Sequence, residues 1–145
     1  MTLKKIINFA FSISEIILIF NKKNANKNME ILVVDDNKEI CTLLESILIA
    51  EGFDAVSCTN PMDFKKIIEK NHPKLIITDL LMSGFDGQTL TKKIKENPKT
   101  QHIKIMMMSA HPDAAKISKS IEVDDFLTKP FEIDELVNKV EVLLK

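Results

Sequence analysis

The stretch ILVVDD, residues 31–36, places an unbroken apolar run directly before two carboxylates. Three further runs have the same form, leading into a single polar or charged residue: Leu75–Thr78 into Asp79, Ile105–Met108 into Ser109, and Phe126–Thr128 into Lys129. Short continuous apolar runs are typical of buried parallel strands. Because the carboxyl ends of parallel strands lie along one edge of a sheet, we expect these polar residues to converge there.

Length and composition set the class of protein. The chain has 145 residues, 45% of them hydrophobic and 28% charged, which is enough for one domain with its own core. With 20 basic and 21 acidic residues, charge favours neither nucleic acid nor an anionic membrane as a partner. Cys41 and Cys58 fit no metal-binding spacing, so we expect buried free thiols and a cytoplasmic location.

From Met29 onward, five apolar runs alternate with stretches of helical periodicity. The predicted strands are Glu30–Val34, Asp54–Cys58, Leu75–Thr78, Lys104–Met108 and Asp125–Thr128. Gly52 ends the first predicted helix, Asn60 before Pro61 begins the second, and Pro112 opens the fourth, while Gly84 and Gly87 mark the loop after Asp79. Five successive β/α units predict an α/β fold with a doubly wound parallel sheet.

Residues 1–28 differ from the rest of the chain. Their apolar segment, residues 6–20, is short for a membrane-spanning helix, and Glu15 disfavours insertion. No clear cleavage site of a secretory signal follows. Three interpretations stay open: an extension upstream of a true start at Met29, a helix facing a membrane or a partner, or a loosely packed extra helix. We therefore divide the chain into an extension, 1–28, and a domain, 29–145.

The polar residues at the predicted edge suit phosphoryl transfer. Asp79 is the candidate nucleophile, since aspartyl phosphates are known covalent intermediates. Asp35, Asp36 and Asp79 would repel one another unless they bind a cation, and Mg²⁺ takes oxygen ligands beside a phosphate. The backbone carbonyl of Leu81 is a further candidate ligand.

Two more groups complete the predicted site. Lys129 would place a positive charge beside the phosphoryl oxygens, and the Ser109 hydroxyl would donate a hydrogen bond to one of them. Each residue alone has a plain structural interpretation, such as a helix cap or a turn. Their joint occurrence at successive strand ends favours one phosphoryl site.

Four motifs resemble the receiver domains of two-component response regulators across residues 29–145: ILVVDDN, ITDLLMSGFDG, MMMSA and FLTKPF. The resemblance implies a flavodoxin-like sheet of five parallel strands in the order 2-1-3-4-5, with five helices. It also implies that Asp79 accepts a phosphoryl group from a phosphohistidine on a sensor histidine kinase or a histidine phosphotransfer protein. Asp35 and Asp36 would be the acidic metal pair, with Asp36 the more direct ligand.

The same resemblance assigns the switch. Ser109 matches the switch hydroxyl, Phe126 the switch aromatic and Lys129 the characteristic lysine, and the bond before Pro130 would be cis. Phosphorylation would draw Ser109 toward the phosphate and turn Phe126 inward. The surface of the fourth helix, fifth strand and fifth helix would then change and control binding to an unknown downstream protein.

Three departures from the family pattern matter. Ser83 stands where the family usually has proline, with little expected effect on the chemistry. The segment from Ser109 to Lys129 is a residue or two shorter than usual, which predicts a short fourth helix. An apolar Leu81 gives no help in orienting water, so we expect a long-lived phosphoryl state.

The expected function is a stand-alone receiver that works as a switch or relay, since no residues follow Lys145 for an output domain. It would be no enzyme beyond its own phosphorylation and dephosphorylation. A phosphatase of the haloacid dehalogenase type would need a second acid where Leu81 stands. An interaction module independent of phosphorylation would not need the complete set of acids and Lys129.

Overall fold

A parallel sheet of five strands forms the centre of the computed structural model, which describes residues 29–145 apart from the side chain of Ser118. The strands lie in the order β2-β1-β3-β6-β7, and every neighbouring pair is parallel. Their bounds are β1 Ile31–Val34, β2 Ala55–Cys58, β3 Leu75–Asp79, β6 Lys104–Ser109 and β7 Asp125–Thr128. Numbered along this sheet, the order is 2-1-3-4-5, so the predicted flavodoxin-like fold is confirmed. The predicted extension, residues 1–28, lies outside the described residues.

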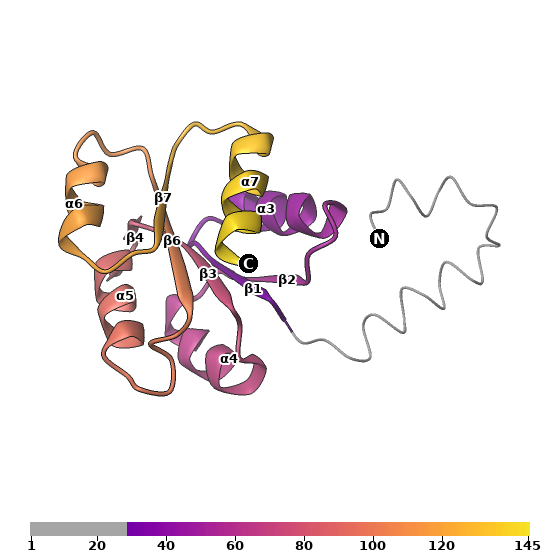
Figure 1. The fold of residues 1–145 in the computed structure, drawn as a ribbon. Helices are drawn as coiled ribbons and strands as arrows, with labels where there is room; N and C mark the ends of the chain where they lie inside the picture. The colour runs from indigo at the N-terminus through magenta and orange to yellow at the C-terminus, as the bar shows by residue number, and fades with distance from the viewer. Residues whose placement is uncertain (1–28) are drawn as a thin grey trace, which may run out of the picture.

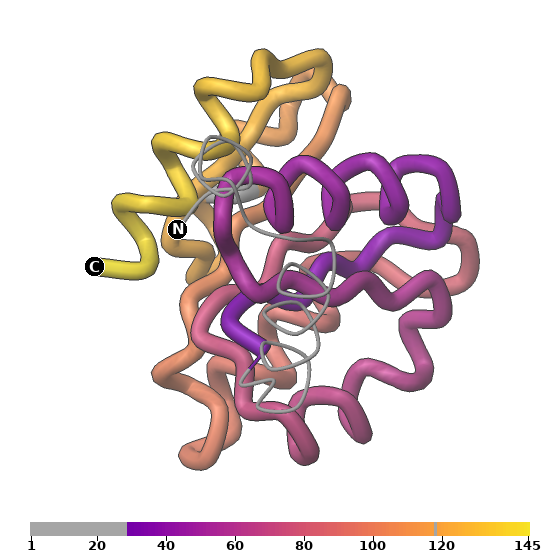
Figure 2. Tube along the Cα trace, turned by 90° about the vertical axis from the view of Figure 1, so that its right-hand side faces the viewer, coloured from indigo at the N-terminus to yellow at the C-terminus, as the bar shows by residue number. Residues whose placement is uncertain are grey.

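Helices cover both faces of the sheet (Figure 1). The described chain contains five α-helices and one 3₁₀ turn: α3 Lys38–Ala50, η1 Pro61–Asp63, α4 Phe64–Asn71, α5 Gly87–Lys95, α6 Ala114–Ser120 and α7 Ile133–Leu143. Helices α3 and α7 pack on one face, and α4 and α5 pack on the other. Helix α6 packs beside β6 and β7 through its own small cluster. Figure 2 shows the same arrangement turned by 90°.

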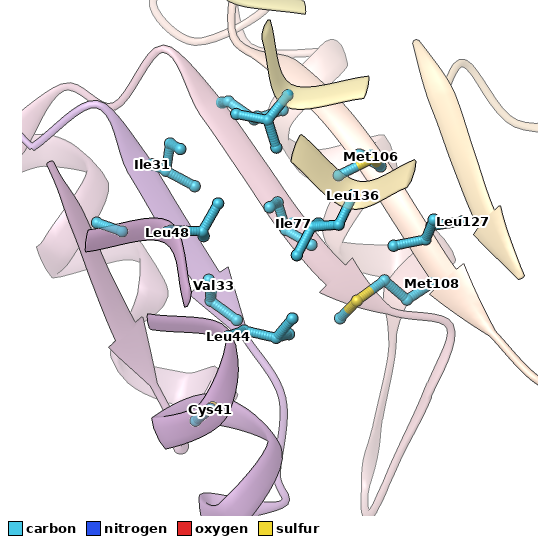
Figure 3. Packing of buried hydrophobic residues seen from close by; sticks show 13 residues of the cluster. Ile31, Val33, Cys41, Leu44, Leu48, Ile77, Met106, Met108, Leu127 and Leu136 are labelled. Carbon is cyan, nitrogen blue, oxygen red and sulfur yellow. The ribbon is translucent and has the colours of Figure 1, made fainter. Parts of the chain in front are cut away.

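Successive residues of β1 face opposite sides of the sheet, and this explains why the strands are continuous apolar runs in the sequence. Ile31 and Val33 face the core under α3 and α7, which Figure 3 shows from close by. Leu32 and Val34 face the core under α4 and α5. All four side chains are fully buried, so every position of the strand must be apolar. This two-sided burial fixes the sheet and thereby the positions of its carboxyl ends.

Several element boundaries differ from the predicted ones. Strands β3 and β6 each run one residue further, so Asp79 and Ser109 are the last residues of their strands. Helix α6 begins at Ala114 rather than at Pro112, and its seven residues agree with the predicted short fourth helix. The Lys129-Pro130 bond is cis, as predicted.

The loop after Asp79 contains a hairpin that the sequence did not indicate. Strands β4, Leu81–Met82, and β5, Phe85–Asp86, pair antiparallel. Each has only two residues, too few to produce a recognisable period. Gly84 lies in the turn with a φ of 73°, but Gly87 is the first residue of α5 and not part of the loop. Across residues 29–145, none of the helices has the length and apolar character needed to span a membrane.

Candidate functional site

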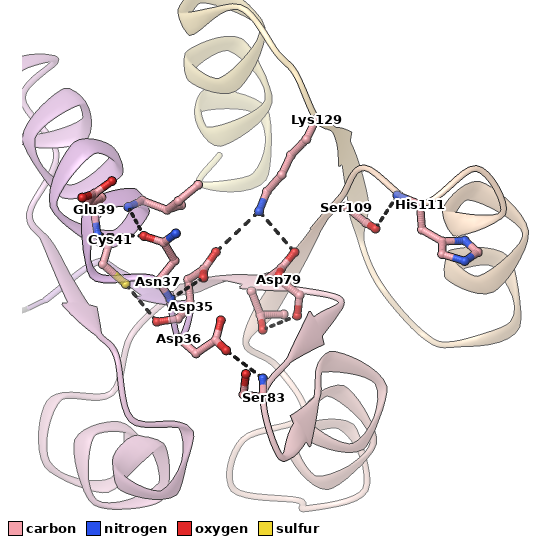
Figure 4. Close-up of polar contacts among 12 residues, drawn as sticks. Asp35, Asp36, Asn37, Glu39, Cys41, Asp79, Ser83, Ser109, His111 and Lys129 are labelled. Carbon is pink, nitrogen blue, oxygen red and sulfur yellow. Dashed lines mark hydrogen bonds and ion pairs between the residues drawn. The ribbon is translucent and has the colours of Figure 1, made fainter.

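The ammonium group of Lys129 lies between two carboxylates at the carboxyl edge of the sheet (Figure 4). Its Nζ is 3.3 Å from Oδ1 of Asp79 and 3.5 Å from Oδ2 of Asp35. Asp79 ends β3, Asp35 directly follows β1, and Lys129 directly follows β7. Three elements far apart in sequence therefore bring these predicted site residues together.

Asp79 is accessible but largely desolvated. Its side chain is 15% exposed, and burial raises the pKa of this carboxyl above its ordinary value. The Lys129 ammonium opposes that rise in pKa, while the nearby Asp35 carboxylate adds to it. A weakly solvated carboxylate of raised basicity beside a fixed cation is suited to attack on an electrophilic phosphorus.

Asp35 is held from several directions. It is 2% exposed, and its Oδ1 accepts a hydrogen bond from the backbone N–H of Asn37 at 2.9 Å. The thiol of Cys41, on α3, donates to the Asp35 backbone oxygen at 3.2 Å. Among the described side chains of residues 29–145, that of Ser118 being left out, Asp35 Oδ2 is the one buried oxygen or nitrogen that has no hydrogen-bond partner. This oxygen faces Lys129 and is available to a further cation.

Asp36 has a different partner. Its Oδ2 accepts a hydrogen bond from the backbone N–H of Ser83 at 2.7 Å, across to the β4–β5 hairpin. That hydrogen bond is the main reason why the pKa of Asp36 lies below its ordinary value. The sequence predicts that Ser83 has little effect on the chemistry. It does not predict this contact, because a sequence does not show where a backbone N–H points.

The residues fit Mg²⁺ in part. Two carboxylates, one of which has a buried oxygen without a hydrogen-bond partner, are the donor chemistry that this ion prefers, and Mg²⁺ commonly takes only one or two protein carboxylates beside a phosphate. In the part of the chain that the structure describes, however, no three acidic, histidine or cysteine side chains form a ready-made metal cage. One carboxylate oxygen of Asp36 is bonded to the Ser83 N–H, and the shared metal role of the three carboxylates stays a prediction.

Ser109 lies at the end of the next strand and is 4% exposed. Its hydroxyl oxygen accepts a hydrogen bond from the His111 N–H at 2.9 Å, and among the described residues it forms none with Asp79. Because the oxygen is an acceptor there, its own proton remains available to a phosphoryl oxygen. The Lys129 N–H donates to the Ser109 backbone oxygen at 2.9 Å, which ties the two strand ends together.

Phe126 and Leu81 flank the site. Phe126 is half-buried and packs with Leu80, Met107 and Ala114 beneath α6. The side chain of Leu81 is exposed, and its backbone pairs with Asp86 in the hairpin. The switch role of Phe126 and the ligand role of the Leu81 carbonyl stay predictions.

Two further residues shape the site without a sequence signal of their own. A β-carbon at Gly87 would overlap the backbone oxygen of Asp79, so α5 can begin beside β3 only with glycine there. Cys41 and Cys58 are buried free thiols as predicted, but Cys41 also anchors the backbone of Asp35. Only three-dimensional proximity reveals either role.

Sheet order and site together define a doubly wound α/β protein with an acid–lysine cluster at the carboxyl edge of its sheet. The family model of the response regulator receiver domain matches residues 31–141, and the chain belongs to this family. The predicted resemblance is thereby confirmed. Receiver domains accept a phosphoryl group and interact with sensor histidine kinases or phosphotransfer proteins.

Individual relatives agree with this assignment. The transcriptional regulatory protein GltR of Pseudomonas aeruginosa is 33% identical over 117 residues, which cover 79% of this chain and 48% of GltR. The response regulator PleD of Caulobacter vibrioides is 32% identical over 117 residues, covering 79% of this chain and 26% of PleD. The chain thus spans about half the length of such curated relatives, or less.

A solved structure agrees as well. The signal receiver domain of a signal transduction histidine kinase from Syntrophus aciditrophicus matches with a TM-score of 0.72 and 31% identity. The match covers 79% of this chain and 89% of that chain.

Proposed function

We propose that this receiver accepts a phosphoryl group on Asp79 from a phosphohistidine and acts as a phosphorylation-controlled switch in two-component signalling. The observation that carries the proposal is the position of Lys129 Nζ between Asp79 and Asp35, at 3.3 and 3.5 Å. A lysine held by two carboxylates would be a costly structural device in a desolvated site. It is useful where negative phosphoryl oxygens must be received beside an attacking carboxylate.

The transfer would proceed by attack of an Asp79 carboxylate oxygen on phosphorus. The P–O bond to Asp79 forms as the P–N bond to the donor imidazole breaks, and the electron pair returns to the ring nitrogen. Lys129 binds an equatorial phosphoryl oxygen, and the Ser109 hydroxyl donates its proton in a hydrogen bond to another. Mg²⁺ bound by Asp35 and Asp36, and by the Leu81 carbonyl, would neutralise charge on the phosphoryl group.

The switch would act through Ser109 and Phe126. The Ser109 hydroxyl, whose oxygen accepts from the His111 N–H, would direct its own proton toward a phosphoryl group on Asp79. Movement at this strand end would disturb the cluster of Phe126 beneath α6, altering the surface formed by α6, β7 and α7. A downstream protein would read that surface. We place this activity in the cytoplasm, where the donor kinase presents its phosphohistidine, and propose no other enzymatic activity.

Intact-mass measurement tests the proposal. The protein is incubated with phosphoramidate, a small donor that carries the same P–N bond, in the presence of Mg²⁺ or of excess EDTA. We expect one added phosphoryl group with Mg²⁺, little with EDTA, and none on the Asp79→Asn variant, whose circular dichroism confirms folding. An unmodified wild type, or equal modification of Asp79→Asn, contradicts the proposal.

A further inference from the structure

The contact between Ser83 and Asp36 joins two loops that are 47 residues apart in sequence. Asp36 lies in the β1–α3 loop, is exposed, and would otherwise be free to change its rotamer. The backbone N–H of Ser83 donates to its Oδ2 at 2.7 Å, the geometry of a charge-assisted hydrogen bond. One carboxylate oxygen is therefore fixed by main chain rather than by a mobile side chain.

The hairpin turn explains why this N–H is available. Met82 pairs with Phe85, so Ser83 and Gly84 are the two central residues of the turn. The φ of 73° at Gly84 matches the second central position of a type II turn. In such a turn the hydrogen bond between the outer residues leaves the N–H of the first central residue unused. Ser83 can therefore donate its N–H to Asp36 without weakening the hairpin.

We propose that the main-chain N–H of Ser83 is a positioning group for the metal site, holding the Asp36 carboxylate ready to ligate a divalent cation. This inference rests on the proposed Mg²⁺-dependent function. A carboxylate already fixed by a second partner loses less freedom when it binds a metal, and such outer partners commonly strengthen metal binding. The hairpin that follows Asp79 would thus help to assemble the acidic pair on the opposite side of the site.

Proline at position 83 isolates this hydrogen bond. The first central position of a type II turn accepts proline, so Ser83→Pro should preserve the hairpin while removing the N–H. Ser83→Ala is the matched variant, because it removes the hydroxyl but keeps the N–H. Mn²⁺ serves as the probe: its free concentration is followed by electron paramagnetic resonance, and Mg²⁺ is added as a competitor. Circular dichroism and thermal melts check that both variants fold.

We expect Ser83→Pro to weaken Mn²⁺ binding by about threefold to tenfold, below the roughly 10- to 100-fold typical of outer partners, because Asp36 is exposed. Ser83→Ala should lose no more than about twofold. If Ser83→Pro binds Mn²⁺ as tightly as wild type or more tightly, the inference is overturned and the proposed function stands. If wild type itself binds no Mn²⁺, the Mg²⁺ dependence of the proposed function fails, and the inference fails with it.

Amide hydrogen exchange gives a second readout that needs no variant at position 83. In wild type, the Ser83 amide should exchange more slowly than the Gly84 amide, and Asp36→Ala should remove that protection. Addition of Mg²⁺ should keep or strengthen the protection of Ser83. A loss of protection on metal binding would mean that the cation pulls Asp36 away from Ser83, and would overturn the positioning role.

Discussion

Gly87 contacts the main chain of Asp79 so closely that a β-carbon at position 87 would overlap the Asp79 backbone oxygen. The Gly87 N–H also donates to the Leu80 backbone oxygen at 2.8 Å, directly after the candidate phosphoryl acceptor. The first turn of α5 thus fixes the backbone that presents Asp79. Because the contact is with backbone rather than with the end of a flexible side chain, little relief is available to a larger residue.

Gly87→Ala should therefore disturb both stability and phosphorylation. We expect the free energy of unfolding to fall by about 1–3 kcal/mol, as for other overpacked sites, and phosphoryl transfer to Asp79 to slow. Urea denaturation and the rate of modification by phosphoramidate measure the two effects. Gly84→Asn is the control, since its left-handed φ suits asparagine and nothing lies within 4 Å of an added β-carbon. Equal behaviour of the two variants would show that the close contact is unimportant.

Lys129→Met should slow phosphorylation of Asp79 by at least ~10-fold, because a fixed positive charge is lost where phosphoryl oxygens must bind. The pKa of Asp79 should rise further above its ordinary value, since Lys129 lowers it. Carboxyl ¹³C titration by NMR follows the pKa, and intact mass follows the rate. Lys139→Met is the matched control: it removes another lysine in a 2.9 Å ion pair, that with Asp125 on β7. A rate loss shared by both variants would argue against a specific role of Lys129.

Asp79→Asn should be more stable than wild type at neutral pH. The folded-state pKa of Asp79 lies above its ordinary value of 3.8, because burial disfavours the charged form. Between 3.8 and the raised pKa, the folded protein holds a proton that the unfolded chain has released, so wild-type stability falls as pH rises through this window. Asp79→Asn has no carboxyl to lose this proton, so its stability does not fall through this pH window. Urea midpoints should separate above pH 3.8 and reach a constant gap; a gap that narrows with rising pH would contradict the expectation.

Asp124 should have the opposite pH behaviour. Burial alone would raise the pKa of its carboxyl, but hydrogen bonds from Lys95 and from the Ile105 N–H, at 2.9 and 2.8 Å, bring the pKa below 3.8. Its stabilisation is therefore complete at neutral pH and is lost as pH falls below 3.8, through the lowered pKa. We expect Asp124→Ala to cost about 1–3 kcal/mol at pH 7 in urea denaturation, because the Ile105 N–H loses its partner.

Asp124→Asn provides the comparison for that experiment. It retains an oxygen for the Ile105 N–H while removing the charge that pairs with Lys95, so its cost should be smaller than that of Asp124→Ala. The difference in stability between wild type and Asp124→Asn should shrink in acid. A difference that is independent of pH would show that the carboxylate charge contributes nothing.

The sequence by itself determined the sheet and most of the site. Strands buried on both faces must be apolar throughout, so runs such as Leu75–Thr78 are visible in a single sequence. The chemistry then appears where each run stops, at Asp35, Asp79 and Lys129. Sheet topology requires those ends to meet, and the structure places Lys129 within 3.5 Å of both carboxylates.

The tertiary structure alone decided how the second acid and the neighbouring backbone are arranged. Asp36 bonds the Ser83 N–H across the site, and Gly87 is needed because α5 begins against Asp79. Both depend on a hairpin with two residues in each strand, too short to leave a pattern of hydrophobicity. Burial requires apolar residues at many successive or regularly spaced positions and is therefore visible in the sequence, whereas the direction of one N–H and the space for one β-carbon arise only when distant segments pack together.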